Sequence, residues 1–118
     1  MTSHRTGLAA EALCRWALRL KGYSIVAQRY RSKLGEIDIV AVRGRRLALV
    51  EVKARDKWQM AAAAIAPRQR ERLARAAADF IARNPRFAAH DIGFDAMLVG
   101  RRSWPRHIVN AWEGTERN

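Results

Sequence analysis

The sequence predicts an α/β domain with a central mixed β-sheet of about five strands flanked by helices, in the order α-β-β-β-α-β-β. Two segments repeat apolar residues at helical spacing. Five short segments are rich in β-branched and aromatic residues, and two of these are joined by a tight-turn sequence. With 118 residues, of which 49% are apolar, we expect one domain with one core, spanning residues 1–118.

The first helix is expected at about residues 6–21, closed by Gly22. Its wider apolar stripe consists of Ala9, Ala12, Leu13, Trp16, Ala17 and Leu20, and a narrower stripe consists of Gly7, Glu11, Cys14 and Leu18. A helix that is apolar on two sides is expected to be covered on both, by the core and by a partner chain, so a homodimer is a hypothesis. Glu11 is either a buried functional acid or an exposed helix residue, and the pattern alone leaves both open.

Strands are expected at residues 23–30, 37–42, 47–53, 92–99 and 107–112, with a second helix at 67–83 ended by Asn84-Pro85. The segment between 53 and 67 is expected to be a loop that leads into this helix. Gly44-Arg45 suits the centre of a tight hairpin turn, because Gly accepts positive φ. Both hairpin strands carry apolar residues on both faces, which places them in the middle of a sheet covered on each side.

The hairpin also brings charged residues together. With the turn centred between residues 44 and 45, Asp38 lies opposite Glu51, and Glu36 lies opposite Lys53. Directly opposed residues on one face have Cβ atoms roughly 4.5–5.5 Å apart. An alternative is a purely structural charge cluster, in which the acids pair with Lys53 and with arginines.

Two carboxylates this close repel each other unless a cation lies between them. Asp38 and Glu51 therefore predict a site for Mg²⁺ or Mn²⁺, to which the carbonyl of Val52 could add a ligand. Lys53 would stand beside the metal, where it could position or deprotonate a water or stabilise charge on a phosphate. This pattern predicts metal-dependent hydrolysis of a phosphodiester bond.

Charge and composition indicate which binding partner and which cellular location to expect. Lys and Arg number 23 against 11 acids, a formal charge of +12, which favours nucleic acid as the partner. The candidate phosphate contacts are Arg55, Lys57, Arg68, Arg70 and Arg72. No apolar run approaches the roughly 20 residues of a membrane span, and residues 1–7 lack the apolar part of a secretion signal, so a cytoplasmic location is expected. The single cysteine, Cys14, excludes a disulfide framework.

The hairpin residues also resemble a known family. GEIDIV at residues 35–40 followed by VEVKAR at 50–55 resembles the GEID…VEVK signature of the bacterial YraN family. That family is similar to Holliday-junction resolvases and belongs to the PD-(D/E)xK nuclease superfamily. Further matches are Gly7 with Glu11, Phe94-Asp95, and Asn110-Ala111-Trp112. The resemblance implies a restriction-endonuclease-like fold and an active-site set of Glu11, Asp38, Glu51 and Lys53, with Glu11 facing the metal.

The chain departs from the family pattern at three positions. The family usually has Asn where Arg29 stands, a Lys near Gln69, and an Arg where this chain has Gly93. The Lys near residue 69 would face phosphate, so Arg68 or Arg70 would have to replace it. These departures bear on binding and activity more than on the fold.

The leading hypothesis is a metal-dependent nuclease that acts on DNA, including branched or otherwise structured DNA. The alternative is a non-catalytic, basic nucleic-acid-binding module with a degenerate site. A third interpretation, a ribosome-associated RNA-binding protein, has only the net charge of +12 in its favour.

Overall fold

The computed structural model describes residues 2–54, 67–100 and 103–112. Its elements are α1 (Thr2–Leu20), β1 (Ser24–Ser32), β2 (Gly35–Arg43), β3 (Arg46–Ala54), α3 (Pro67–Arg83), the 3-10 turn η1 (Pro85–Phe87), β4 (Asp91–Val99) and β5 (Arg106–Trp112). The expected order is confirmed, and α3 has the expected limits. The loop expected before α3 lies outside the described residues.

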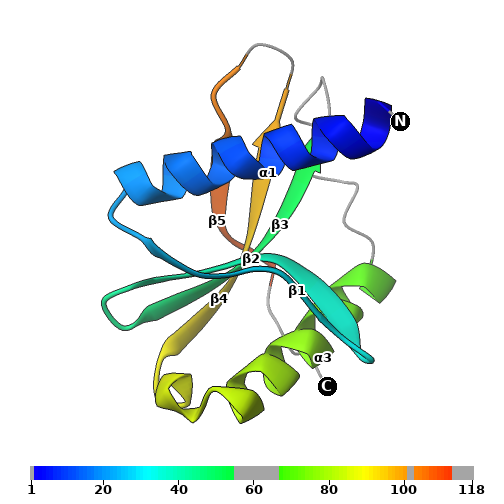
Figure 1. Cartoon of the computed structure of the whole chain (residues 1–118). Helices are drawn as coiled ribbons and strands as arrows, with labels where there is room; N and C mark the ends of the chain where they lie inside the picture. Colours follow the sequence, from blue (N-terminus) through cyan, green and yellow to red (C-terminus); the bar gives the residue numbers. More distant parts are fainter. Residues whose placement is uncertain (1, 55–66, 101–102, 113–118) are drawn as a thin grey trace.

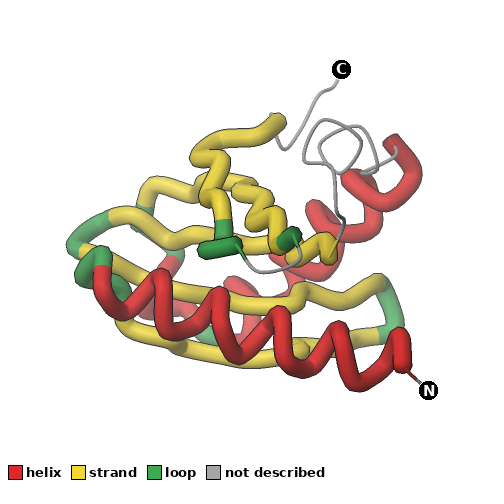
Figure 2. The backbone as a smooth tube through the Cα atoms, turned by 90° about the horizontal axis from the view of Figure 1, so that it is seen from above, coloured by secondary structure: helices red, strands yellow, loops and turns green. Residues whose placement is uncertain are grey.

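The strands form one five-stranded sheet in the order β1-β2-β3-β4-β5. All neighbours are antiparallel except β3 and β4, which are parallel, so the sheet is mixed. A parallel pair needs a crossover connection, and α3 lies in the connection between these two strands. Helices α1 and α3 lie on opposite sides of the sheet (Figure 1), and α1 runs across its face (Figure 2).

Each face of the sheet has its own apolar core. On the α1 face, Cys14, Ala17 and Leu18 pack with Ile39, Ala41, Ala48, Val50 and Met97. On the α3 face, Leu73, Ala76, Ala77 and Phe80 pack with Ile37, Val40, Leu47, Leu49 and Phe94. The central strands β2 and β3 contribute to both cores, which confirms the position expected for the hairpin.

The narrower stripe of α1 is the one that faces the sheet, with Cys14 and Leu18 fully buried. Of the wider stripe, Ala17 packs in the same core, whereas Trp16 and Leu20 are 59% and 74% exposed. The described residues therefore leave part of the wider apolar side of this helix uncovered. No helix in the described part of the chain is both long enough and apolar enough to cross a membrane.

Glycines with positive φ end α1 and close the hairpin. Gly22 has φ +95°, and the N–H groups of Gly22 and Tyr23 donate to the carbonyls of Arg19 and Leu18, which is a Schellman helix end. Gly44 has φ +61° in the two-residue turn between β2 and β3. Both glycines lie where the sequence predicts a helix end and a hairpin turn.

Candidate active site

The β2–β3 ladder has the expected register but stops just before the acidic residues. Its pairs run from Arg43 opposite Arg46 to Ile39 opposite Val50. At the next position, the Asp38 carboxylate accepts a hydrogen bond from the Val52 backbone N–H at 2.8 Å. The carboxylate thus replaces a ladder bond where the two strands separate.

Strand β2 also rotates at this point. Ile37 packs in the core on the α3 face, whereas Ile39 packs in the core on the α1 face. Strict alternation would place these two residues on the same face, so the strand turns about its axis at Asp38. The rotation directs the Asp38 side chain into the gap between β2 and β3.

The predicted pairing of Glu36 with Lys53 is wrong, because the ladder ends before it reaches them. Glu36 instead pairs with Arg31 of β1, with Nε 3.3 Å from Oε1. Lys53 lies beside Glu51, with Nζ 3.5 Å from Oε2. The structure therefore brings Lys53 to the acidic pair.

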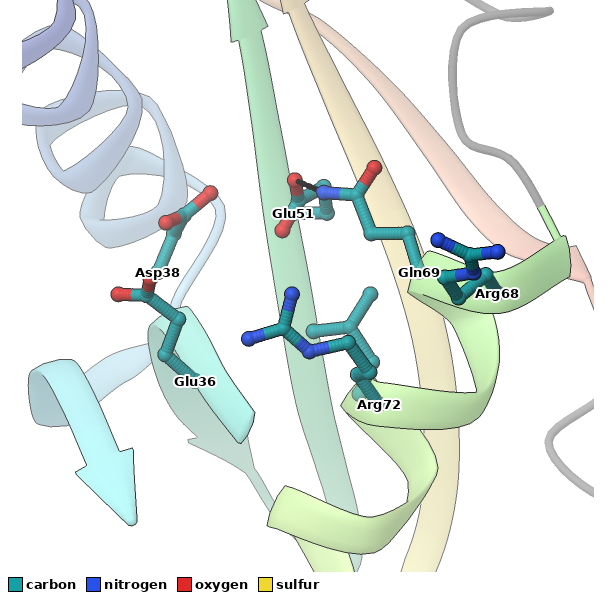
Figure 3. A pocket seen from close by; sticks show the side chains of 7 residues that line it. Glu36, Asp38, Glu51, Arg68, Gln69 and Arg72 are labelled. Atoms are coloured by element: carbon teal, nitrogen blue, oxygen red, sulfur yellow. Dashed lines mark hydrogen bonds between the residues drawn. The ribbon is translucent and has the colours of Figure 1, made fainter. Parts of the chain in front are cut away.

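Glu51 is held by contacts from its own strand β3 and from helix α3. Its side chain is buried on the α3 face, two residues after the core residue Leu49. The side-chain amide of Gln69, in the first turn of α3, donates a hydrogen bond to Glu51 Oε2 (Figure 3). Lys53 contacts the same oxygen. The family pattern has a Lys near this position that would face phosphate, whereas Gln69 fixes the orientation of a carboxylate.

Burial raises the pKa values of both Asp38 and Glu51. Burial, followed by the charge of Asp38, raises the pKa of Glu51 to about 8, and the ammonium of Lys53 only partly opposes this. Burial also raises the pKa of Asp38, although the Val52 N–H and the hydrogen bond with Glu51 oppose the shift. A buried and a half-buried carboxyl group, both with raised pKa values, form a site that a hard cation would stabilise in its ionised state.

The acidic pair opens into a pocket of about 260 Å³. Its lining residues are Glu36, Asp38, Glu51, Arg68, Gln69, Arg72 and Leu73. Figure 3 shows the Arg72 guanidinium extending from α3 toward the acidic side chains of β2. The pocket therefore combines carboxylates from β2 and β3 with arginines from the start of α3.

Gly35 explains how α3 comes so close to β2. A Cβ atom added at this glycine would lie 2.4 Å from the backbone carbonyl oxygen of Arg72, closer than such atoms approach. Any larger residue would push the helix away from the strand. The glycine at the start of the GEID segment thus sets the distance between Gln69 and Glu51.

Glu11 is buried at 8% exposure on the sheet-facing side of α1, so the exposed-residue alternative is wrong. Its Oε1 lies 3.2 Å from Arg29 Nε. Burial and then the charge of Asp38 raise the pKa of Glu11, and the nearby Arg29 and Arg15 oppose the shift. Among residues 2–54, 67–100 and 103–112, however, no group of three His, Cys, Asp or Glu side chains could hold a metal ion.

Only some of the predicted phosphate-contacting residues line the pocket in the described part of the chain. Arg68 and Arg72 line the pocket. The guanidinium of Arg70 lies over the ring of Trp112, 5.7 Å from its centroid, so this arginine packs against β5. Arg55 and Lys57 lie outside the described residues.

A second polar cluster lies on the α1 face and surrounds the fully buried Asp95. Arg46 donates two hydrogen bonds to the Asp95 carboxylate at 2.9 and 2.7 Å. His107 Nε2 lies 2.7 Å from Oδ2, and the Asn110 N–H donates to Oδ1 at 2.9 Å. A Cβ atom at Gly93 would collide with Arg46, at 2.1 Å from Nη2, so the glycine makes room for this guanidinium.

Sequence reasoning missed this cluster as a unit. Its only signals were an Asp within an apolar strand and the Phe94-Asp95 resemblance, because its partners come from β3 and β5. Burial opposes ionisation of Asp95, but hydrogen bonds from His107, Arg46 and Asn110 outweigh it and lower its pKa to about 2. The cluster fixes β3, β4 and β5 relative to one another.

The architecture is a mixed-sheet α/β fold compatible with the restriction-endonuclease-like class, with an acidic pair where two central strands separate. A family model described as "Uncharacterised protein family UPF0102" matches residues 10–99, and the chain belongs to this family. This membership agrees with the resemblance to the YraN family.

The matches to curated relatives span most of both chains. The chain is 52% identical over 112 residues to a UPF0102 protein of Parvibaculum lavamentivorans, covering 95% of this chain and 84% of the relative. It is 45% identical to a UPF0102 protein of Bradyrhizobium diazoefficiens, with 98% and 86% covered. It is 47% identical to one of Methylorubrum extorquens, with 94% and 87% covered.

Proposed function

We propose that this protein is a metal-dependent nuclease of the PD-(D/E)xK type, which hydrolyses phosphodiester bonds in DNA, including branched or structured DNA. One observation carries the proposal: the half-buried Asp38 and the buried Glu51 lie together beside Lys53, in a pocket bordered by arginines. An acidic pair alone would repel a polyanion. Acids combined with arginines in one pocket suit a bound cation that faces a phosphate.

The donor set fits Mg²⁺ or Mn²⁺. Mg²⁺ is usually held by one or two carboxylates, with water and substrate phosphate oxygens as the other ligands, and this site offers Asp38 and Glu51. The backbone carbonyl of Val52 is a further candidate ligand. When bound, such an ion would lower the pKa of a water molecule and screen the charge of the phosphate.

The surrounding residues have separate roles in this proposal. Lys53 stabilises negative charge that develops on the phosphate and orients the attacking water. Gln69 positions Glu51 through its hydrogen bond. Arg68 and Arg72 bind phosphates next to the one that is cleaved, because they line the same pocket.

The non-catalytic binding module remains the alternative, and one pair of variants separates it from a nuclease. For a nuclease, Asp38→Asn abolishes metal-dependent cleavage of labelled DNA, yet binding measured by fluorescence anisotropy is retained or strengthened. The reason is that the carboxylate opposes phosphate. For a binding module, wild type shows no cleavage, and only the double variant Arg68→Gln/Arg72→Gln changes function, by weakening binding.

A further inference from the structure

Arg29 of β1 has an unusual backbone conformation and lies across from Asp38 of β2. Its φ is +51°, and it is one of two non-glycine residues with positive φ in the described chain. A left-handed backbone conformation is unfavourable for arginine, so contacts with the surrounding residues must offset its energetic cost. Such strain at a specific residue points to a local role.

The position of Arg29 links it to the acidic pair. In the β1–β2 ladder, Gln28 pairs with Ile39 and Tyr30 pairs with Ile37. Arg29 therefore falls between these pairs, across from Asp38, where β2 rotates. The left-handed residue of β1 and the rotated residue of β2 are neighbours.

From this position the Arg29 side chain reaches Glu11 of α1, with Nε 3.2 Å from Oε1. The carboxylate is 11% exposed and the Arg29 side chain 39% exposed, so the guanidinium lies on the solvent side of a buried acid. Arg29 thus contacts Glu11 and lies across the β1–β2 ladder from Asp38. Arg29, with a smaller contribution from Arg15, supplies positive charge on the α1 side of the site, as Lys53 does beside Glu51.

We propose that Arg29 is a tethered cation that competes with a divalent metal ion for Glu11 and thereby sets the metal affinity of the Asp38–Glu51 site. The inference rests on the proposed function. While Arg29 pairs with Glu11, its charge opposes the use of this carboxylate as a third ligand. When Arg29 withdraws, Glu11 becomes free to complete the site.

Removing Arg29 should strengthen metal binding in two ways. It removes a positive charge that repels the metal, and it releases Glu11. Only the second contribution requires Glu11. A double-mutant cycle between the two residues therefore isolates the competition from general electrostatics.

The experiment is Mn²⁺ binding by isothermal titration calorimetry, with full-length wild type, Arg29→Asn, Glu11→Gln and the double variant. Asn is chosen because it tolerates left-handed backbone, and thermal melting without metal confirms that each variant folds. We expect Arg29→Asn to bind Mn²⁺ about tenfold more tightly than wild type. In the Glu11→Gln background, the same substitution should change affinity by about twofold or less.

Arg83→Gln is the matched control. Arg83 lies in the last turn of α3, its side chain is 70% exposed, and it pairs with Asp79 rather than with an acid of the candidate site. Its removal should change Mn²⁺ affinity by about twofold or less, because the exposed charge is screened. Arg29→Lys, which keeps the cation, should retain wild-type affinity.

The proposal is overturned if Arg29→Asn has the same effect with and without Glu11, or no larger effect than Arg83→Gln. The Glu51→Gln variant keeps this result separate from the proposed function. If wild type binds Mn²⁺ and Glu51→Gln does not, the result supports the metal site. Wild-type Mn²⁺ affinity in Arg29→Asn would then refute only the competition between Arg29 and the metal ion. If no variant binds Mn²⁺, both proposals fail.

Discussion

Replacing Asp95 by Asn is expected to be among the most destabilising single changes to the fold. Asp95 is fully buried and accepts from Arg46 twice, from the Asn110 N–H and from His107. An Asn side chain would keep one acceptor oxygen but would place an amide N–H donor against the N–H donors that surround Asp95. Arg46 would also lose the carboxylate with which it pairs. Removing one partner of a buried ion pair typically costs about 3–5 kcal/mol. At about 4 °C per kcal/mol, the melting temperature should fall by about 12–20 °C.

The assay is thermal and urea denaturation at pH 7, followed by circular dichroism, with Asp91→Asn as the control. Asp91 lies at the start of the same strand and its side chain is exposed, so the control should stay within about 0.5 kcal/mol of wild type. The reasoning about the cluster would be refuted if Asp95→Asn lost less than about 1 kcal/mol relative to this control.

The same cluster predicts a dependence on pH. The folded-state pKa of Asp95, about 2, lies below its ordinary value, so the ionised form stabilises the fold. This contribution of about 2 kcal/mol is complete above about pH 4 and is lost as the pH falls toward 2. The stability difference between wild type and Asp95→Asn should therefore shrink in acid, and a difference that stays constant down to pH 2 would contradict the assignment.

Three further predictions concern the candidate site. Mn²⁺ should raise the melting temperature of wild type with increasing concentration, but not that of Asp38→Asn, and equal shifts in both would mean that the ion binds elsewhere. Gly35→Ala should cost about 1–3 kcal/mol in urea denaturation, because the new Cβ meets the α3 backbone, whereas Gly7→Ala, with open space around it, should be neutral or stabilising. Arg72→Gln should lower the slope of log affinity for DNA against log salt by about 1, whereas Arg83→Gln, which removes an arginine that pairs with an acid on α3, should leave it unchanged.

Local chemistry made much of the fold predictable. Pro67 and Asn84-Pro85 mark the ends of α3, and the structure begins and ends this helix where they indicate. Gly44 fixed the hairpin turn, and from the turn followed the register of β2 and β3 as far as Ile39 opposite Val50. These features depend on residues a few positions apart, so a single sequence is enough to predict them.

Features set by tertiary contacts were not predictable in the same way. The error at Glu36 arose because the ladder was extended past Asp38, whereas the Asp38 carboxylate takes a backbone N–H of β3 and ends the pairing. The two stripes of α1 could not show which side meets the sheet, since both are apolar. The partners of Asp95 lie 49 residues before it and 12 and 15 residues after it, too far apart for any local pattern.

The central claim is tested most directly by cleavage of labelled four-way-junction, duplex and single-stranded DNA in Mg²⁺, Mn²⁺ or EDTA. Wild type is compared with Glu51→Gln and with Glu71→Gln, the same change at a side chain that is 71% exposed on α3. The account predicts metal-dependent cleavage by wild type and Glu71→Gln, none in EDTA, and none with Glu51→Gln. Binding without cleavage, unaffected by metal or by Glu51→Gln, would contradict it and identify the protein as a binding module.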